Sequence, residues 1–292
     1  MMSLRHRHPG CACVVFACVL LPVIFGVNPV TAGIGLVSGM GLLFLLEEGR
    51  GRRRLGWYPA VALASGVLNP LFNHNGRTVL FFLNRNPVTR EAVLYGLVMG
   101  MLIAAALVWA RCFSHVMDTE KLQAVTGRLS PKVSLILSMS LRYLPLFRRQ
   151  AAQVREAQAG LGLIREENGL DRLRGGLRVM DGMVTWALEN GITTADSMTA
   201  RGYGSGHRTR YQVYVWERGD TALTALSLGL MLIVAAARLT GQIGYTWYPE
   251  LRVPAASFGS AAAYGAFGLL CLTPAALEIK DRWKWKVLRS RI

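Results

Sequence analysis

The feature that most constrains this chain is a stretch of 38 residues, 9–46, that contains no Asp, Glu, Lys or Arg. As one helix it would be about 57 Å long, whereas the hydrocarbon core of a bilayer is about 30 Å thick. We therefore expect two membrane-spanning helices separated at Asn28-Pro29. The first begins like a signal peptide, but a second apolar stretch follows at once, so we expect it to be retained.

Four further apolar stretches have about the length of a membrane span. Uncharged runs cover residues 92–110, 221–237 and 253–277, near the roughly 20 residues that a spanning helix needs. A fourth stretch, 55–72, is interrupted by two prolines and is expected to be a short or kinked span. The sequence thus predicts an all-α, polytopic membrane protein with about six transmembrane helices.

Basic residues are unevenly distributed along the chain. With six spans both termini share one side of the membrane, and that side receives 28 of the 33 Lys and Arg. The positive-inside rule makes it the cytoplasm. We expect four N-terminal transmembrane helices in 1–110, a cytosolic and interfacial region in 111–219, and two C-terminal transmembrane helices with a basic cytosolic tail in 220–292.

The region 111–219 is too polar to span a membrane, yet apolar residues recur in it at helical spacing. The run 133–141 predicts an interfacial helix, and Pro145, close to Arg142, predicts a break or kink before a further helix in 146–159. A second long helix that ends at Gly202 carries an apolar stripe. The stripe consists of Leu177, Met180, Val184, Leu188, Ala195 and Met198.

Both predicted helices end at a small residue close to a glycine, which favours a left-handed cap. Arg201 could simply be a cation that satisfies the helix dipole and needs no partner. Alternatively, the blunt helix end inserts into a groove on another protein, where the Arg201 guanidinium meets carboxylates. Two such ends, about forty residues apart in the sequence, favour a protein that binds two related subunits.

Four segments resemble one known family. They are SMTARGYG (197–204), NPLFNHNGRTVLFFLNRNPVTREAVLYG (69–96), SLRYLPLF (140–147) and EAQAGLG (156–162). Together they are similar to the transmembrane T component of energy-coupling factor transporters, which are ABC importers. This family of T components includes the Q-type subunit of cobalt and nickel importers. The resemblance covers most of the chain between Asn69 and Arg210.

The resemblance implies a non-catalytic, multi-pass subunit in the plasma membrane of a prokaryote. Such a subunit transmits ATP-driven motion of two cytosolic ABC ATPase subunits to a separate substrate-binding membrane subunit, the S component, for uptake of a vitamin or a transition-metal ion. It implies no cofactor and no metal site. The ATPase-binding residues would be Ala200, Arg201, Gly202, Gly160, Leu161 and Gly162, with a coupling-helix kink at Arg142 and Pro145.

One position departs from the family pattern. The first helix-end signature carries an arginine in the family, and Leu161 stands there in this chain. Leucine cannot make a charge-assisted contact with a carboxylate. Either the groove that receives this helix end is more apolar, or Arg155 or Arg165 reaches across. The difference between the two helix ends also suggests two non-identical ATPases.

The sequence gives less support to other classes of function. No Gly-x-x-x-x-Gly-Lys-Ser/Thr motif occurs, so ATP must be hydrolysed by partner subunits. An intramembrane lipid or isoprenoid enzyme is the alternative, but Asp118 and Glu120 are the nearest approach to the paired carboxylates that it needs. With His115 they could form a metal or acid–base site, although a solvated helix start explains them better. The aromatic and basic tail 282–291 fits anionic membrane lipid rather than nucleic acid.

Overall fold

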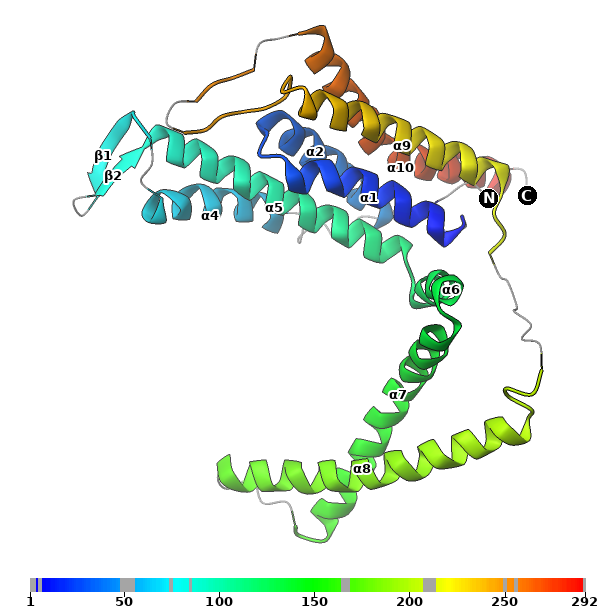
Figure 1. Cartoon of the computed structure of the whole chain (residues 1–292). Coiled ribbons are helices and arrows are strands. Elements are labelled where there is room, and N and C mark those ends of the chain that lie inside the picture. Colours follow the sequence, from blue (N-terminus) through cyan, green and yellow to red (C-terminus); the bar gives the residue numbers. More distant parts are fainter. Residues whose placement is uncertain are drawn as a thin grey trace. The chain divides into compact units, whose positions relative to one another are not determined.

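The computed structural model describes residues 4, 7–47, 56–73, 76–83, 86–163, 169–206, 214–248, 251–254 and 257–290. Among these residues it contains nine helices and one two-stranded antiparallel sheet (Figure 1). The chain divides into two compact units. The membrane unit comprises residues 1–122 and 214–292, and the α7/α8 unit comprises residues 123–213.

Helices form in all six stretches that the sequence predicted to span the membrane. Four of them are long and apolar enough to cross a bilayer, namely α2 (Pro29–Leu46), α5 (Arg90–Val116), α9 (Arg218–Leu239) and α10 (Phe258–Arg289). The other two, α1 (Pro9–Phe25) and α4 (Trp57–Phe72), have 17 and 16 residues, fewer than the roughly 20 of a typical span. The all-α, polytopic fold is confirmed.

The first two helices are separated where the sequence predicted. α1 ends at Phe25, and the side-chain oxygen of Asn28 caps α2 by accepting a hydrogen bond from the backbone N of Val30 at 2.9 Å. Asn28 Nδ2 donates to the carbonyl of Ile243 at 3.1 Å and to Tyr264 Oη at 2.9 Å. These bonds tie the turn between α1 and α2 to the segment after α9 and to α10.

The core of the membrane unit is built around α5, which packs against α1, α2 and α4. Trp109 of α5 is fully buried, and its indole Nε1 donates to the carbonyl of Gly35 on α2 at 2.9 Å. A Cβ at Gly39 would lie 2.9 Å from the indole nitrogen, so the ring requires glycine there. Phe16 of α1 completes the contact, with its ring centroid 6.0 Å from that of Trp109. Such close packing over small residues is how helices associate in membranes.

The start of α1, the end of α2, the end of α5 and the start of α9 lie at the same end of the membrane unit. Arg111 Nε of α5 donates to Glu47 Oε1, just beyond α2, at 3.1 Å, and Arg7 Nη1 pairs with Asp220 Oδ1 of α9 at 3.0 Å. Figure 1 shows the last turns of α10 at this end as well. Both connections to the α7/α8 unit therefore leave from one end of the membrane unit.

A β-hairpin lies between α4 and α5 and was not predicted from the sequence. Strands β1 (Val79–Leu83) and β2 (Asn86–Thr89) pair antiparallel. Thr78 Oγ1 donates to Glu91 Oε1 at 2.7 Å, which fixes the base of the hairpin to the first turn of α5. The strands are short, and a five-residue apolar run does not distinguish a strand from a helix segment. The side chain of Phe82 is exposed.

Three helices lead through the α7/α8 unit: α6 (Thr119–Leu129), which begins in the membrane unit, α7 (Pro131–Gly160) and α8 (Gly169–Ala200). Pro145 was predicted to break or kink the helix; no break occurs there, because Pro145 lies inside the single 30-residue helix α7. Proline removes one backbone N–H, but the hydrogen bonds of the adjoining turns remain and keep the segment helical. The kink at Arg142 and Pro145 stays a prediction.

α7 and α8 pack against each other in opposite directions. Contacts between them pair later residues of α7 with earlier residues of α8: Tyr143 Oη donates to Thr194 Oγ1 at 2.8 Å, the rings of Phe147 and Trp186 meet edge to face at 5.5 Å, and a Cβ at Gly182 would lie 3.4 Å from Val154. The C-terminal ends of the two helices therefore lie at opposite ends of the pair.

Candidate coupling site

α7 and α8 end in the two segments that the sequence predicted as partner-binding helix ends. We call Gly160, Leu161 and Gly162 the first tip, and Ala200, Arg201 and Gly202 the second tip. In the first tip, Gly162 has a φ of +68°, and its N–H donates to the carbonyl of Ala159 at 2.9 Å. The N–H of Leu163 donates to the carbonyl of Gln158 at 3.0 Å. This bond pair defines a Schellman cap.

The second tip repeats this geometry. Gly202 has a φ of +79°, its N–H donates to the carbonyl of Thr199 at 2.9 Å, and the N–H of Tyr203 donates to the carbonyl of Met198 at 3.0 Å. The left-handed residue turns the chain sharply away from the helix axis, and the paired bonds satisfy carbonyls that the helix leaves open. Both helices end bluntly, as the glycines predicted.

All six residues of the two tips are exposed. The Leu161 side chain is 74% exposed, and a Cβ at Gly160 or Gly162 would meet no atom within 4 Å. The structure shows no hydrogen bond or ion pair of the Arg201 guanidinium to any described residue. The two tips are therefore available to a partner, in contrast to helix ends that are buried in their own fold.

The cap geometry by itself does not identify a binding site. The end of α9 in the membrane unit is also a Schellman cap, in which Gly241 has a φ of +73°, its N–H donates to the carbonyl of Arg238, and the N–H of Gln242 donates to the carbonyl of Ala237. What distinguishes the two tips is their place on two long, paired, polar helices outside the membrane unit.

The antiparallel packing separates the two tips widely. The carbonyl of Leu163, one residue after the first tip, accepts a hydrogen bond from Arg178 of α8 at 2.8 Å. From Arg178 to Ala200, at the second tip, α8 continues for 22 residues, or about 33 Å at 1.5 Å per residue. The first and second tips are therefore on the order of 30 Å apart, a distance that suits two subunits better than one groove.

The tips differ in the source of their positive charge. At the second tip Arg201 is itself the C-cap residue, whereas the first tip has Leu161 at that position. The sequence offered Arg155 or Arg165 as substitutes. Arg155 is exposed on α7, and Arg165 lies outside the described residues. The guanidinium that the structure does place beside the first tip belongs to Arg178, which sequence reasoning missed because its contact depends on how α7 and α8 pack.

The apolar stripe of α8 is exposed. Val184 and Trp186 are two positions apart, about 200° around the helix, so the stripe faces away from the side that packs on α7. Large side chains that are more than half exposed extend along this face: Leu170, Leu173, Leu177, Met180, Val184, Leu188 and Ile192. A patch of this size on one helix face indicates contact with a further apolar surface.

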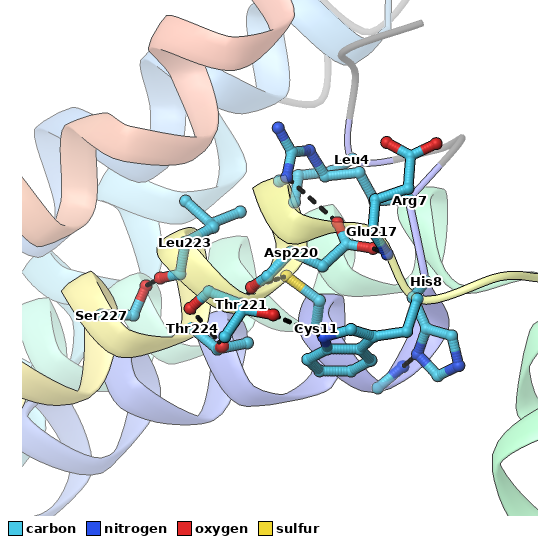
Figure 2. Close-up of polar contacts among 12 residues, drawn as sticks. Leu4, Arg7, His8, Cys11, Glu217, Asp220, Thr221, Leu223, Thr224 and Ser227 are labelled. Carbon is cyan, nitrogen blue, oxygen red and sulfur yellow. Dashed lines mark hydrogen bonds and ion pairs between the residues drawn. The ribbon is translucent and has the colours of Figure 1, made fainter.

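A polar cluster joins the N-terminal segment to the first turn of α9 (Figure 2). Asp220, only 2% exposed, accepts the Arg7 hydrogen bond, and its carbonyl lies 3.7 Å from Cys11 Sγ. The rings of His8 and Trp216 lie 4.9 Å apart. Removing one partner of a buried ion pair costs about 3–5 kcal/mol. The cluster therefore fixes the point at which the chain returns from the α7/α8 unit.

The two connections to the α7/α8 unit lie close together on the membrane unit. Burial raises the pKa of Tyr214, the residue at which the chain re-enters the membrane unit, and the carboxylates of Glu120 and Asp118 in the outgoing connection raise it further. Lys121 is buried, and its Nζ donates to the carbonyl of Val116 at 2.8 Å. Asp118 and Glu120 thus lie at the helix start that the sequence favoured.

The proposed cluster of His115, Asp118 and Glu120 does not form a metal site among the described residues, where no three His, Cys, Asp or Glu side chains converge. His115 Nε2 instead lies 3.2 Å from Glu47 Oε1, beside Arg111. Burial alone would raise the pKa of Glu47, but the hydrogen bonds from His115 and Arg111 outweigh it and lower the pKa. These contacts bind α2 to the last turns of α5.

Comparison with known proteins supports the resemblance. No family model matches the chain. It is 25% identical over 250 residues to an energy-coupling factor transporter transmembrane protein of Exiguobacterium sibiricum, covering 79% of this chain and 94% of that protein. The proteins of the same name in Streptococcus thermophilus and Streptococcus equi are 27% and 25% identical over 233 and 262 residues, or 73% and 82% of this chain and 86% and 95% of theirs. The resemblance seen in the four segments is confirmed over most of the chain.

Proposed function

The chain is related to the transmembrane proteins of energy-coupling factor transporters, and we propose that it is the T component of such an importer. In this role it binds two cytosolic ATPase subunits, one at each tip, and a substrate-binding membrane subunit. The observation that carries the proposal is the pair of exposed, blunt helix ends on α7 and α8, set on the order of 30 Å apart.

The proposed mechanism is mechanical. When two ATPase subunits close on ATP and reopen, each displaces the helix end that it holds, and packed helices pass on such movements as rigid bodies. α7 and α8 are about 45 and 48 Å long by their residue counts, and their contacts at Phe147 and Trp186 couple them. The two connections deliver the displacement to α5 and α9 of the membrane unit, and from there to the substrate-binding subunit.

The orientation in the membrane follows from the two ends of the membrane unit. The end that carries both connections also holds Arg7, Arg111, Lys121 and Arg282, whose guanidinium donates to the carbonyl of Leu45 near the end of α2. By the positive-inside rule we assign this end to the cytoplasm of a prokaryotic cell, and both chain termini are assigned to the same side. The last turns of α10, with exposed Trp283 and Trp285 among basic residues, would lie at anionic lipid headgroups.

The cargo is a vitamin or a transition-metal ion, in keeping with the class of importer. Its choice is assigned to the substrate-binding subunit, and ATP hydrolysis is assigned to the ATPases. Two non-identical ATPases fit the chain better than two identical ones, because the first tip presents Leu161 where the second presents Arg201. The chain itself acts as the coupler.

The test is co-purification. The chain is co-expressed with the ATPase subunits of the same organism and purified in mild detergent, as wild type and as Arg201→Glu. We expect the wild type to retain both ATPases. The amount of ATPase that co-purifies with the variant should be at least tenfold lower, because the reversed charge repels the carboxylates that arginine would meet. Arg174→Glu, also exposed on α8 but far along the helix from the second tip, is the matched control. If the Arg201→Glu variant retains the ATPases fully, Arg201 only caps the helix and does not bind them.

A further inference from the structure

The first tip lacks an arginine of its own but has a guanidinium from the neighbouring helix. Arg178 Nη1 of α8 donates to the carbonyl of Leu163 at 2.8 Å, two residues beyond Leu161. Each of the two helix ends therefore has an arginine close to it. At the second tip it is Arg201, and at the first tip it comes from α8.

We propose that Arg178 is the ATPase-binding arginine of the first tip and that it takes the role of Arg201 there. The inference rests on the proposed function and deepens it, since it names the residue that recognises the partner. The partner surface that fits is a groove with at least one carboxylate at its rim, into which Leu161 inserts as an apolar contact.

The geometry of the guanidinium permits both contacts at once. Arginine carries five N–H donors in a planar fork, and its bond to Leu163 uses Nη1. The residue is exposed, and within the described chain no acidic side chain pairs with it. Its bond to the tip fixes the direction of the fork, so less side-chain entropy is lost when a partner carboxylate binds.

The position of the charge also suits the helix end. The C-terminal end of α7 carries partial negative charge that attracts a cation, and the carbonyl of Leu163 is part of the turn that follows the first tip. Arg155 lies six residues before Leu161 on α7, about 9 Å back along the helix axis. Arg178 is thus held at the tip by a hydrogen bond, whereas Arg155 lies behind it on the helix.

The experiment measures the affinity of the purified ATPase pair for the chain in lipid nanodiscs. We expect Arg178→Gln to raise the Kd at least tenfold and the double variant Leu161→Arg with Arg178→Gln to return it to within about threefold of wild type, because the arginine is then restored on α7 itself. Arg174→Gln, one turn away on α8, should change the Kd less than twofold.

The outcomes separate a binding role from a structural one. A Kd for Arg178→Gln within twofold of wild type, with Arg201→Glu still impaired, would show that Arg178 only caps α7. A raised Kd that Leu161→Arg does not rescue would also overturn the inference, since the loss would then come from altered packing of α7 on α8. If wild type binds no ATPase, the proposed function itself fails.

Discussion

At the scale of residues, the local and non-local parts of the candidate site were not equally predictable. Arg201 was identified because helix-end signals are local: a small residue, an arginine and a glycine follow one another in the sequence. Arg178 carries no such signal, since its contact with Leu163 spans 15 residues and depends on the path of the chain between two helices. The pair of Arg7 and Asp220 spans 213 residues and likewise could not be predicted from local sequence.

Glu47 offers a test of stability against pH. Its pKa is lowered from the ordinary value of 4.5 in the folded protein, so the folded state binds this proton less readily than the unfolded state. The carboxylate therefore contributes stability above pH 4.5, and the contribution is lost as the pH falls through the folded pKa. We expect Glu47→Gln to lower the melting temperature in detergent at pH 7, with a gap from wild type that closes toward pH 3.

The control for Glu47→Gln is Glu189→Gln, at an exposed position on α8. Its melting temperature should follow that of wild type at each pH. A gap for Glu47→Gln that stays constant from pH 7 to pH 3 would contradict the assigned role of the ionised carboxylate.

At the scale of elements, helices were predicted well and their interruptions less so. The ends at Gly162 and Gly202 were predicted because the left-handed conformation favours glycine, and both φ values agree. Pro145 was expected to break or kink the helix; α7 continues through it without a break, and the kink stays a prediction. The hairpin was missed because its strands are too short for periodicity to identify them.

The helix ends themselves can be tested at Gly202. Its φ of +79° costs a residue with a Cβ about 1–2 kcal/mol. Gly202→Ala should therefore loosen the cap of α8 and raise the Kd for the ATPase pair several-fold, with little change in overall helicity by circular dichroism. Gly206→Ala alters a nearby exposed glycine that lacks a positive φ and should bind as wild type does. Equal affinity of both variants would mean that the shape of the second tip is not recognised.

At the scale of the whole molecule, the membrane unit has two chemically distinct ends. One end carries both connections to the α7/α8 unit and the contacts of Glu47 with Arg111 and His115. The other end carries the turn held by Asn28 and the base of the hairpin at Thr78. Positive charge collects at the first end, and the sequence had indicated this asymmetry from the distribution of Lys and Arg alone.

This arrangement predicts the topology. Green fluorescent protein fused after the C-terminus should fluoresce, because the proposed orientation assigns that end to the cytoplasm, and alkaline phosphatase fused there should be inactive. Alkaline phosphatase inserted after Gly244, in the segment between α9 and α10, should be active. The opposite pattern at both positions would place the two tips outside the cell, where no ATP is available, and would contradict the coupling role.

The sequence by itself determined the class of fold, the approximate placement of the helices and the two blunt tips, because these depend on apolar length, on helical periodicity and on a glycine within each tip. Tertiary structure decided what lies next to each tip. The antiparallel packing of α7 on α8 separates the tips on the order of 30 Å, brings Arg178 beside Leu163 and turns the apolar stripe of α8 outward. Such contacts depend on which faces of two helices meet, and neither helix encodes that choice alone.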